Sequence, residues 1–438
     1  MNRLMQGAFW IGVYVLLTLT PLFLLLIGPT PPGRSFWTEF SIASGFAGMA
    51  IMGMQFLITA RFRHVSEPYG MDIMYHFHRQ ISWVALVLVL AHPIIIFWER
   101  PEMVRLLNVF EAPWRARLAV TSTVALLVLI ATSVWRKLLG LQYEVWRVLH
   151  GALAVLVIGL GMAHAVMWGN YIGTPWKAAF WIALTAFWIG ALAYVRLWKP
   201  VLMLRCPYRV TAVRPERGNA WTLALEPEGH PGLRFQPGQF TWLSLWNGPF
   251  GMREHPFSFS SSAERQGQVA ITIRELGDFT STIKEVQPGQ RAYLDGPYGA
   301  FSVDRHRSPG YVLIAGGVGI TPMMSTLRTL ADRGNDQPLL LIYANNTWED
   351  IIFRDELDEL PQRLDLTIVH VLRQPPEGWP GETGFVTAET LKRHLPANRN
   401  SRDYFICGPD VMMDAVERAL TDLGVSLVYI HSERYNFV

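Results

Sequence analysis

Cysteine is almost absent from this chain, which holds only Cys206 and Cys407 among 438 residues. The two lie far apart in the sequence, so we expect neither a disulfide framework nor a redox CxxC pair. Charged residues are scarce as well: they make up 17% of the chain, against about 25% in typical soluble proteins. With a formal net charge of +3 and no basic patch, nothing indicates a nucleic-acid partner.

The missing charge leaves long apolar runs in the first 200 residues. Each run approaches the roughly 20 apolar residues that a helix needs to cross a bilayer. A seventh run is absent, so the sequence predicts a membrane-embedded, all-α six-helix bundle over residues 1–200. The runs lie at about 8–28, 40–60, 80–98, 118–135, 148–169 and 178–195.

Lysine and arginine predict the orientation of this bundle. With the N-terminus inside, the inner segments hold more of these residues than the outer loops, among them Arg61, Arg136 and Lys137. Positively charged residues favour the cytoplasmic side of a membrane. We therefore expect the N-terminus and everything after Lys199 to lie in the cytoplasm.

Four histidines interrupt the apolar runs as two matched pairs. His78 and His92 bound the segment HRQISWVALVLVLAH, and His150 and His164 bound HGALAVLVIGLGMAH. The 14 positions between partners turn a helix through about 1400° and raise it about 21 Å, so both members share one face at opposite depths. The two segments are the third and fifth helices and run in the same direction. His78 is therefore expected to meet His150 at the inner level, and His92 to meet His164 at the outer level.

Zinc, copper and haem iron are the candidate metals for these two sites. An ionisable residue inside a membrane is costly and indicates a function, although one isolated histidine is also compatible with a neutral side chain bonded to its neighbours. Two imidazoles leave zinc short of its usual four ligands, whereas they suit the axial positions of a haem. We favour two b-type haems. Small residues near the ligands make room for the macrocycle: Ala91, Gly151, Gly161 and Ala163.

The second half of the chain changes character at about residue 205. Short alternating strands such as YRVTAV and VAITIRE predict an antiparallel β-barrel over 201–304. From 309 onward, strands such as YVLIA and LLLIYA alternate with helices, which predicts an α/β doubly wound domain over 305–438. The first of these strands runs into GGVGITPM. Glycines there either bring backbone N–H groups close to phosphate oxygens or merely form a tight turn.

Five motifs follow one another along this half: HPFS, IRELGDFT, GPYG, GGVGITPM and CGP. In this order they resemble the ferredoxin-NADP reductase family. Together with the histidine pairs, the chain resembles the NADPH oxidase/ferric reductase superfamily in its prokaryotic form. The resemblance implies an integral protein of the cell (inner) membrane that binds FAD, two haem b groups and NADPH, with NADH as the alternative.

The resemblance also implies a role for each motif residue. One group would hold FAD, Ser258 at the isoalloxazine and Arg274 at the pyrophosphate: His255, Pro256, Phe257, Ser258, Arg274, Gly277 and Thr280. A second group would hold the nicotinamide dinucleotide, Arg373 at a 2′-phosphate: Gly316, Gly317, Gly319, Thr321, Arg373, Gly408 and Pro409. A third group would act at the flavin, Cys407 by packing, Glu433 as an acid and Phe437 as a covering aromatic, with Tyr435 as the alternative to Phe437.

The resemblance implies that electrons pass from cytosolic NAD(P)H through FAD and the two haems to an acceptor on the outer side. Dioxygen, giving superoxide, is the first candidate. A ferric chelate and a periplasmic protein are the others, and no obligatory protein partner is evident. Oxygen-reducing members often carry a further histidine where this chain has Ile96, which weakens the first candidate. Two rival interpretations are a non-catalytic haem sensor and a six-helix transporter fused to a reductase.

Overall fold

The computed structural model describes residues 3–28, 34–246, 248–251, 253–265 and 267–435. The chain divides into two compact units, within 1–69 and 73–198 for the first and within 70–72 and 199–437 for the second. This division lies close to the first domain boundary predicted from the sequence, after residue 200.

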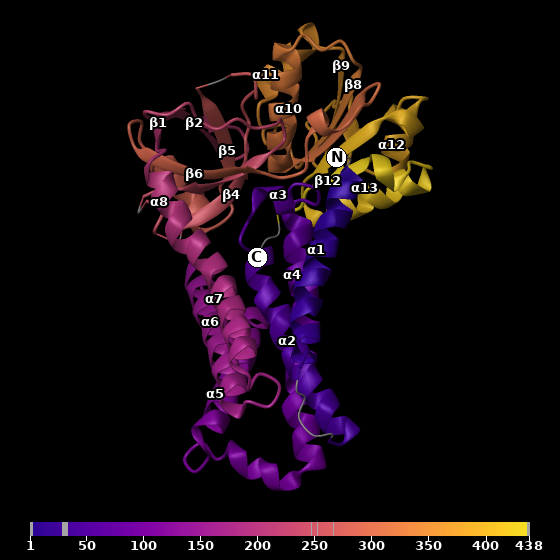
Figure 1. Ribbon diagram of the computed structural model, residues 1–438. Helices are drawn as coiled ribbons and strands as arrows, with labels where there is room; N and C mark the ends of the chain where they lie inside the picture. The colour runs from indigo at the N-terminus through magenta and orange to yellow at the C-terminus, as the bar shows by residue number, and fades with distance from the viewer. Residues whose placement is uncertain (1–2, 29–33, 247, 252, 266, 436–438) are drawn as a thin grey trace. The chain divides into compact units, whose positions relative to one another are not determined.

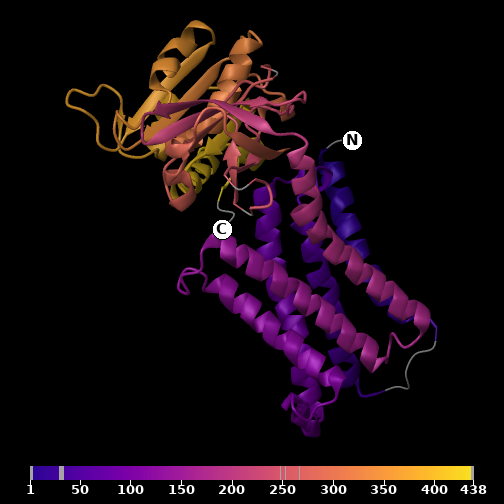
Figure 2. The ribbon, with the colours of Figure 1, turned by 90° about the vertical axis from the view of Figure 1, so that its left-hand side faces the viewer.

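Long apolar helices make up the first unit, and they lie side by side in both views (Figures 1 and 2). The described residues contain six helices long and apolar enough to cross a membrane, as the sequence predicted. Two short helices, α3 (Arg63–Ser66) and η1 (Pro101–Leu107), lie between them. The long helices are α1 (Arg3–Leu25), α2 (Phe36–Ile58), α4 (Met71–Glu99), α5 (Trp114–Val134), α6 (Tyr143–Trp168) and α7 (Pro175–Ala193), the last followed by η2 (Tyr194–Trp198) and α8 (Lys199–Leu204).

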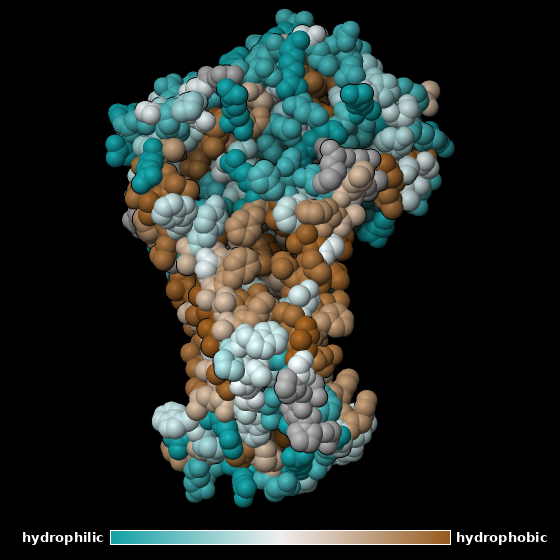
Figure 3. Space-filling model, viewed as in Figure 1, coloured by the Kyte–Doolittle hydropathy of each residue, from teal (hydrophilic) through white to brown (hydrophobic). Residues whose placement is uncertain are grey.

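The outward faces of these helices are apolar, and Figure 3 shows the helical region largely in brown. Phe23 is 64% exposed and Val87 is 65% exposed. Apolar surface on this scale is unfavourable in water and favourable in lipid. Inside the bundle Trp181 and Trp188 are fully buried. A Cβ on Gly53 would lie 2.2 Å from the Trp188 ring, so only glycine lets α2 approach α7 this closely.

The first sheet of the second unit is antiparallel, in the order β4-β3-β6-β1-β2-β5. An isolated bridge between Phe259 and Ile271 links the chain beyond β4 to β5. The sheet agrees with the predicted strands, but closure into a barrel is not confirmed. The strands are β1 (Tyr208–Glu216), β2 (Ala220–Pro227), β3 (Phe240–Ser244), β4 (Glu254–Ser258), β5 (Val269–Arg274) and β6 (Arg291–Tyr298), with α9 (Asp278–Ser281), η3 (Ile283–Glu285) and η4 (Val303–Arg305).

The second sheet is parallel, in the order β10-β9-β8-β7-β11-β12. Its strands are β7 (Tyr311–Gly316), β8 (Leu339–Asn345), β9 (Leu366–Leu372), β10 (Glu382–Thr383), β11 (Asp403–Cys407) and β12 (Ile430–Ser432). The helical segments are η5 (Gly317–Gly319), α10 (Ile320–Asp332), α11 (Arg354–Glu359), η6 (Leu360–Gln362), α12 (Ala388–His394), η7 (Arg399–Ser401), α13 (Asp410–Asp422) and η8 (Leu427–Tyr429).

Helices cover both faces of this parallel sheet. Met323 and Leu327 of α10 join the apolar core on one face, and Met413 and Val416 of α13 join the core on the other. Strands buried on both faces read as continuous apolar runs, as in YVLIA. The predicted doubly wound arrangement is therefore observed. It brings the loops that follow β7 and β11 to one edge, because the carboxyl ends of parallel strands meet there.

Candidate functional site

The paired histidines of the first unit meet as the spacing predicted. The rings of His78 (α4) and His150 (α6) have centroids 6.3 Å apart, and those of His92 and His164 have centroids 6.4 Å apart. The helices α4 and α6 therefore face each other at two levels. Two other histidines near these helices, His64 and His76, are both exposed.

These separations fit an iron atom between each pair. An imidazole–metal bond is about 2 Å long, and the ring centre lies about 1.1 Å beyond the nitrogen. Two axial imidazoles on one iron therefore have centroids about 6.2 Å apart. The same separations also fall within the range of ordinary edge-on aromatic contacts, so they are compatible with a bridging iron and do not by themselves require one.

The Nδ1 atom of each of the four histidines has a hydrogen-bond partner other than the facing histidine. His78 Nδ1 lies 2.8 Å from Gln55 Oε1, and His150 Nδ1 lies 3.1 Å from Ser133 Oγ. In the outer pair, His164 Nδ1 lies 2.7 Å from the Arg115 carbonyl oxygen. His92 Nδ1 lies 3.1 Å from the Ser41 carbonyl oxygen and 3.0 Å from the Ser41 hydroxyl, which itself donates to the His92 carbonyl.

These partners determine the tautomer of each ring. A carbonyl oxygen only accepts, so the Nδ1 of each outer histidine donates a proton. Gln55 Nε2 donates to Ile51 O, which turns Oε1 toward His78. Ser133 Oγ donates to Leu129 O at 2.7 Å, so it accepts from His150. All four Nδ1 atoms then carry hydrogen, and the Nε2 lone pairs are left for a metal.

The predicted space for a macrocycle is only partly supported. A Cβ on Gly151 would meet one atom, of Leu192, at 3.9 Å, which is open space. A Cβ on Gly161 would lie 3.3 Å from Met49 and 3.6 Å from Ser122. Gly161 therefore serves helix packing. Ala91 and Ala163 are half-buried.

In the second unit, the HPFS motif forms β4. His255 stacks on Phe279, with centroids 4.0 Å apart, and Phe257 lies at 6.1 Å from the same ring. Pro256 pairs with Trp242 of β3. Ser258 is buried at the end of the strand, and its hydroxyl lies 2.6 Å from the Tyr435 hydroxyl.

Tyr435, Glu433 and Cys407 form one buried group with Ser258. The Tyr435 hydroxyl donates to Glu433 Oε2 at 2.8 Å, so Ser258 donates to Tyr435. Burial raises the pKa of the Glu433 carboxyl and of the Cys407 thiol. A neutral thiol is a poor nucleophile, which agrees with a packing role for Cys407. Phe437 lies outside the described residues.

Arg274, predicted to bind the FAD pyrophosphate, lies close to Gly317, predicted to bind the pyrophosphate of the nicotinamide dinucleotide. A Cβ on Gly317, whose φ is +53°, would lie 3.1 Å from a guanidinium nitrogen of Arg274. Arg274 at the end of β5 is thus beside the glycine loop that follows β7. The Gly277 N–H donates to Thr280 Oγ1 at 2.9 Å. Gly277 and Thr280 therefore bond each other here, and a phosphate would have to replace that bond.

The glycine loop and the CGP motif pack directly together. A Cβ on Gly319 would lie 2.2 Å from the Cys407 carbonyl oxygen, and one on Gly316 would lie 2.9 Å from Pro409. A Cβ on Gly408 would lie 3.1 Å from the Gly316 backbone. These glycines are required because two loops meet at the carboxyl edge of adjacent strands.

Two other predicted nucleotide ligands differ in accessibility. Thr321 is buried and its hydroxyl donates to Val318 O at 2.8 Å, so it supports the helix start. Arg373 is exposed just beyond β9. Its guanidinium lies 5.6 Å from the centre of the Phe385 ring, so a charged group remains available at that edge.

Sequence reasoning missed the residues that orient the four histidines. Gln55 and Ser133 are polar residues in apolar helices, and that contrast was the available signal. The backbone carbonyls that contact His92 and His164 could not be predicted from the sequence, because every residue has a carbonyl. Tyr435, named only as an alternative, is the described aromatic that contacts Ser258.

Three family models match this chain. A ferric reductase like transmembrane component matches residues 44–161, an FAD-binding domain matches 210–302, and an oxidoreductase NAD-binding domain matches 313–418. The combination supports the NADPH oxidase/ferric reductase superfamily. The two reductase domains support an oxidoreductase enzyme that binds FAD and a nicotinamide dinucleotide, and the helices support an integral membrane protein.

Curated relatives resemble the second half of the chain. The NADH-cytochrome b5 reductase 1 of Lodderomyces elongisporus is 37% identical over 171 residues, covering 37% of this chain and 56% of that protein. That of Mortierella alpina is 34% identical over 173 residues, covering 39% and 58%. The chain thus spans little more than half the length of these relatives. Both are fungal and do not support the expected prokaryotic form.

Two solved structures are similar at lower identity. The cytochrome b5 reductase domain of Ulva prolifera nitrate reductase is 21% identical with a TM-score of 0.46, covering 52% of this chain and 96% of that chain. A flavohemoglobin from Malassezia yamatoensis is 18% identical with a TM-score of 0.49, covering 92% and 99%.

Proposed function

We propose that this protein is a transmembrane NAD(P)H oxidoreductase that delivers electrons to an acceptor on the outer side of the cell membrane. NAD(P)H would bind on the cytoplasmic side, because the distribution of lysine and arginine along the sequence favours that side for everything after Lys199. The observation that carries this proposal is the pair of histidine pairs, each 6.3–6.4 Å apart with every Nδ1 bonded outward.

Each histidine pair would hold one b-type haem. His78 and His150 would hold the inner haem, and His92 and His164 would hold the outer one. A haem held by two histidines would supply one-electron transfer. The hydrogen-bonded Nδ1 atoms hold each ring in one orientation, which reduces rearrangement when the charge on the site changes.

FAD would lie against β4 and the end of β5. Ser258 and the stacked pair His255–Phe279 would contact the flavin ring, and Arg274 would bind the pyrophosphate. FAD accepts two electrons as hydride and releases them singly. The neutral Cys407 would pack beside the nicotinamide, and Tyr435, which contacts Ser258, would cover the flavin face until nicotinamide binds.

Dioxygen, reduced to superoxide, is our first candidate for the acceptor. The second candidate is an anionic ferric chelate, favoured by a cation beside the outer pair: Arg115 accepts from His164 through its carbonyl, and its guanidinium lies 4.6 Å from the centre of the Trp168 ring. Ile96, where oxygen-reducing relatives often carry histidine, also favours this second candidate. Donation to a periplasmic protein is the third.

NADPH is our preferred donor because Arg373 offers a cation at the carboxyl edge of β9 for a 2′-phosphate. The alternative, NADH, draws support from the names of the fungal relatives. Steady-state rates with each donor at equal concentration distinguish the two.

The first experiment uses purified protein reconstituted with FAD under air. NAD(P)H oxidation, haem spectra and cytochrome c reduction with and without superoxide dismutase are recorded for the wild type, His92→Gln and His76→Gln. His76 is the matched control, since it lies on the same helix and is exposed. We expect two b-type haems in the wild type and in His76→Gln, and loss of the outer haem with loss of acceptor reduction in His92→Gln.

The outcomes separate the rival interpretations. Dismutase-sensitive cytochrome c reduction supports dioxygen as acceptor, whereas haem reduction with little oxygen consumption supports a ferric chelate or a protein. A haem sensor would oxidise NAD(P)H negligibly. A transporter fused to a reductase would lack haem absorbance, and its turnover would be unchanged in His92→Gln. Either of these last two results would overturn the proposal.

A further inference from the structure

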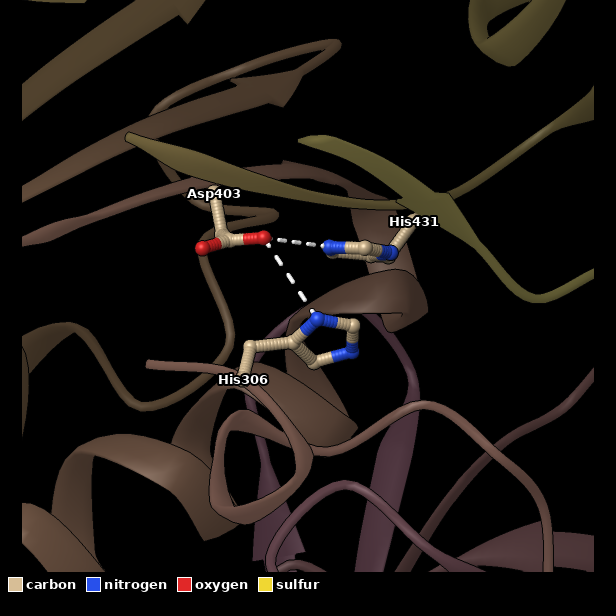
Figure 4. A group of neighbouring side chains, drawn as sticks. All are labelled: His306, Asp403 and His431. Carbon is tan, nitrogen blue, oxygen red and sulfur yellow. Dashed lines mark hydrogen bonds and ion pairs between the residues drawn. The ribbon is translucent and has the colours of Figure 1, made fainter. Parts of the chain in front are cut away.

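Three metal-ligating side chains meet at the amino end of β11, at the edge of the parallel sheet (Figure 4). One ligand atom from each of His306, Asp403 and His431 lies within 4.8 Å of the others. His431 Nε2 is 2.7 Å from Asp403 Oδ1, and His306 Nδ1 is 3.5 Å from the same oxygen. Both imidazoles thus contact the same carboxylate oxygen.

The fold holds these three side chains on one face. β11 and β12 are parallel, with Phe405 opposite His431, so Asp403, two residues before Phe405, shares their face. His306 directly follows η4, in the link between the two sheets, and its carbonyl accepts from the Tyr311 hydroxyl at 3.1 Å. The rings of His306 and His431 lie 3.7 Å apart and are held against Phe405.

The charge balance of this cluster differs from that of an ordinary histidine–carboxylate pair. His394 lies at the same distance, 2.7 Å, from Glu382, but Glu382 also pairs with Arg393. Asp403 has no lysine or arginine partner in the described part of the chain; its ion-pair contacts there are the two histidines. The Asp403 carboxylate therefore has no lysine or arginine beside it to balance its charge among the described residues, and a dication held by the three side chains would balance it.

We propose that His306, Asp403 and His431 bind one divalent transition-metal ion of the zinc class. Two imidazole nitrogens and one carboxylate oxygen are borderline ligands that suit zinc and its neighbours, and they leave one position for water. The cluster lies near the surface, since the histidine side chains are 18% and 17% exposed while Asp403 is 5% exposed. This site is separate from the histidine pairs and does not rest on the proposed electron transfer.

The consequence concerns the C-terminal segment. His431 lies on β12, two residues before Glu433 and four before Tyr435. β12 is a short edge strand of three residues, and edge strands with few ladder bonds open readily. An ion that joins His431 to Asp403 and His306 would anchor β12, and with it the segment that brings Tyr435 to Ser258.

The test uses full-length protein loaded with haem and FAD, stripped of loosely bound metal by a chelator and then titrated with zinc chloride. Calorimetry and elemental analysis give affinity and stoichiometry for the wild type, His306→Gln, His431→Gln and the matched control His394→Gln. We expect one zinc per chain in the wild type and the control, with affinity at least about tenfold lower in the other two variants. Equal affinity in all four proteins, or no zinc in the wild type, would overturn the proposal.

Two measurements keep the test decisive if a variant folds poorly. Bound FAD and thermal unfolding report on folding, and zinc-edge X-ray absorption of the wild type reports the ligands directly. Two imidazoles and one carboxylate support the site, whereas thiolate ligands refute it. Hydrogen exchange over 429–435 should slow on zinc addition in the wild type and not in His306→Gln; unchanged exchange in both would refute the anchoring of β12.

Discussion

The inner histidine pair depends on side chains that can be changed one at a time. His78 Nδ1 donates to Gln55 Oε1 at 2.8 Å, and His150 Nδ1 donates to Ser133 Oγ at 3.1 Å. The outer pair is bonded to the carbonyls of Ser41 and Arg115, which substitution leaves in place, and to the Ser41 hydroxyl. Gln55→Leu should therefore weaken the inner haem site selectively.

The magnitude follows from one lost hydrogen bond. A hydrogen bond contributes about 0.5–1.5 kcal/mol net, and 1.4 kcal/mol is a factor of about ten in affinity. Gln55→Leu should therefore lower the affinity of the proposed inner site for haem about twofold to tenfold. The bond would make His78 a stronger donor to ferric iron, so the lost affinity should fall on the ferric form and raise the inner potential. A tenfold change is about 59 mV for one electron, which gives a rise of about 20–60 mV.

The assay is a redox titration of the purified protein, followed by the haem absorbance, with haem per chain measured in parallel. Ser133→Ala should shift the same step less, because the contact of Ser133 with His150 is longer. Ser44→Ala is the matched control: Ser44 donates to the carbonyl four residues earlier at 2.8 Å, as Ser133 does at 2.7 Å, and no histidine contact accompanies it.

Two results would refute this reasoning. The first is an equal shift in the potentials of both haem titration steps of Gln55→Leu. That result would mean that the bond between Gln55 and His78 does not act on the inner pair alone. The second is an equal effect of Ser44→Ala and Ser133→Ala, because that would mean loss of a helix back-bond explains the change.

Three further predictions concern the second unit. Iodoacetamide at neutral pH should label exposed Cys206 and spare Cys407, whose pKa is raised by burial; mass spectrometry of the digested protein checks this, and rapid labelling of Cys407 would contradict it. Burial raises the pKa of Glu433 above 4.5, so the folded state holds that proton more tightly and stability should fall as pH rises from 4.5 through the raised pKa. Glu433→Gln should flatten this fall in thermal unfolding measured against pH, and an unchanged slope would contradict the assignment. Arg373→Ala should raise KM for NADPH about tenfold and leave KM for NADH unchanged, and an equal effect on both would remove Arg373 from the 2′-phosphate site.

Much of the architecture was predictable because it depends on periodicity. Six apolar runs of membrane length predicted six helices, since lipid leaves a single chain segment few other ways to satisfy its backbone. The spacing of 14 predicted which histidines share a face, because the helical turn is a local property. Strands such as YVLIA could be predicted because burial on both faces makes them continuously apolar.

The sequence by itself therefore determined the helices, the two types of sheet and the pairing of His78 with His150 and of His92 with His164. Only the tertiary structure decided what those residues touch. The Nδ1 acceptors come from neighbouring helices, Tyr435 reaches Ser258 across 177 positions, and Asp403 meets His306 and His431 from three separate segments. Such contacts depend on how elements pack, and packing joins residues whose separation along the chain carries no periodic signal.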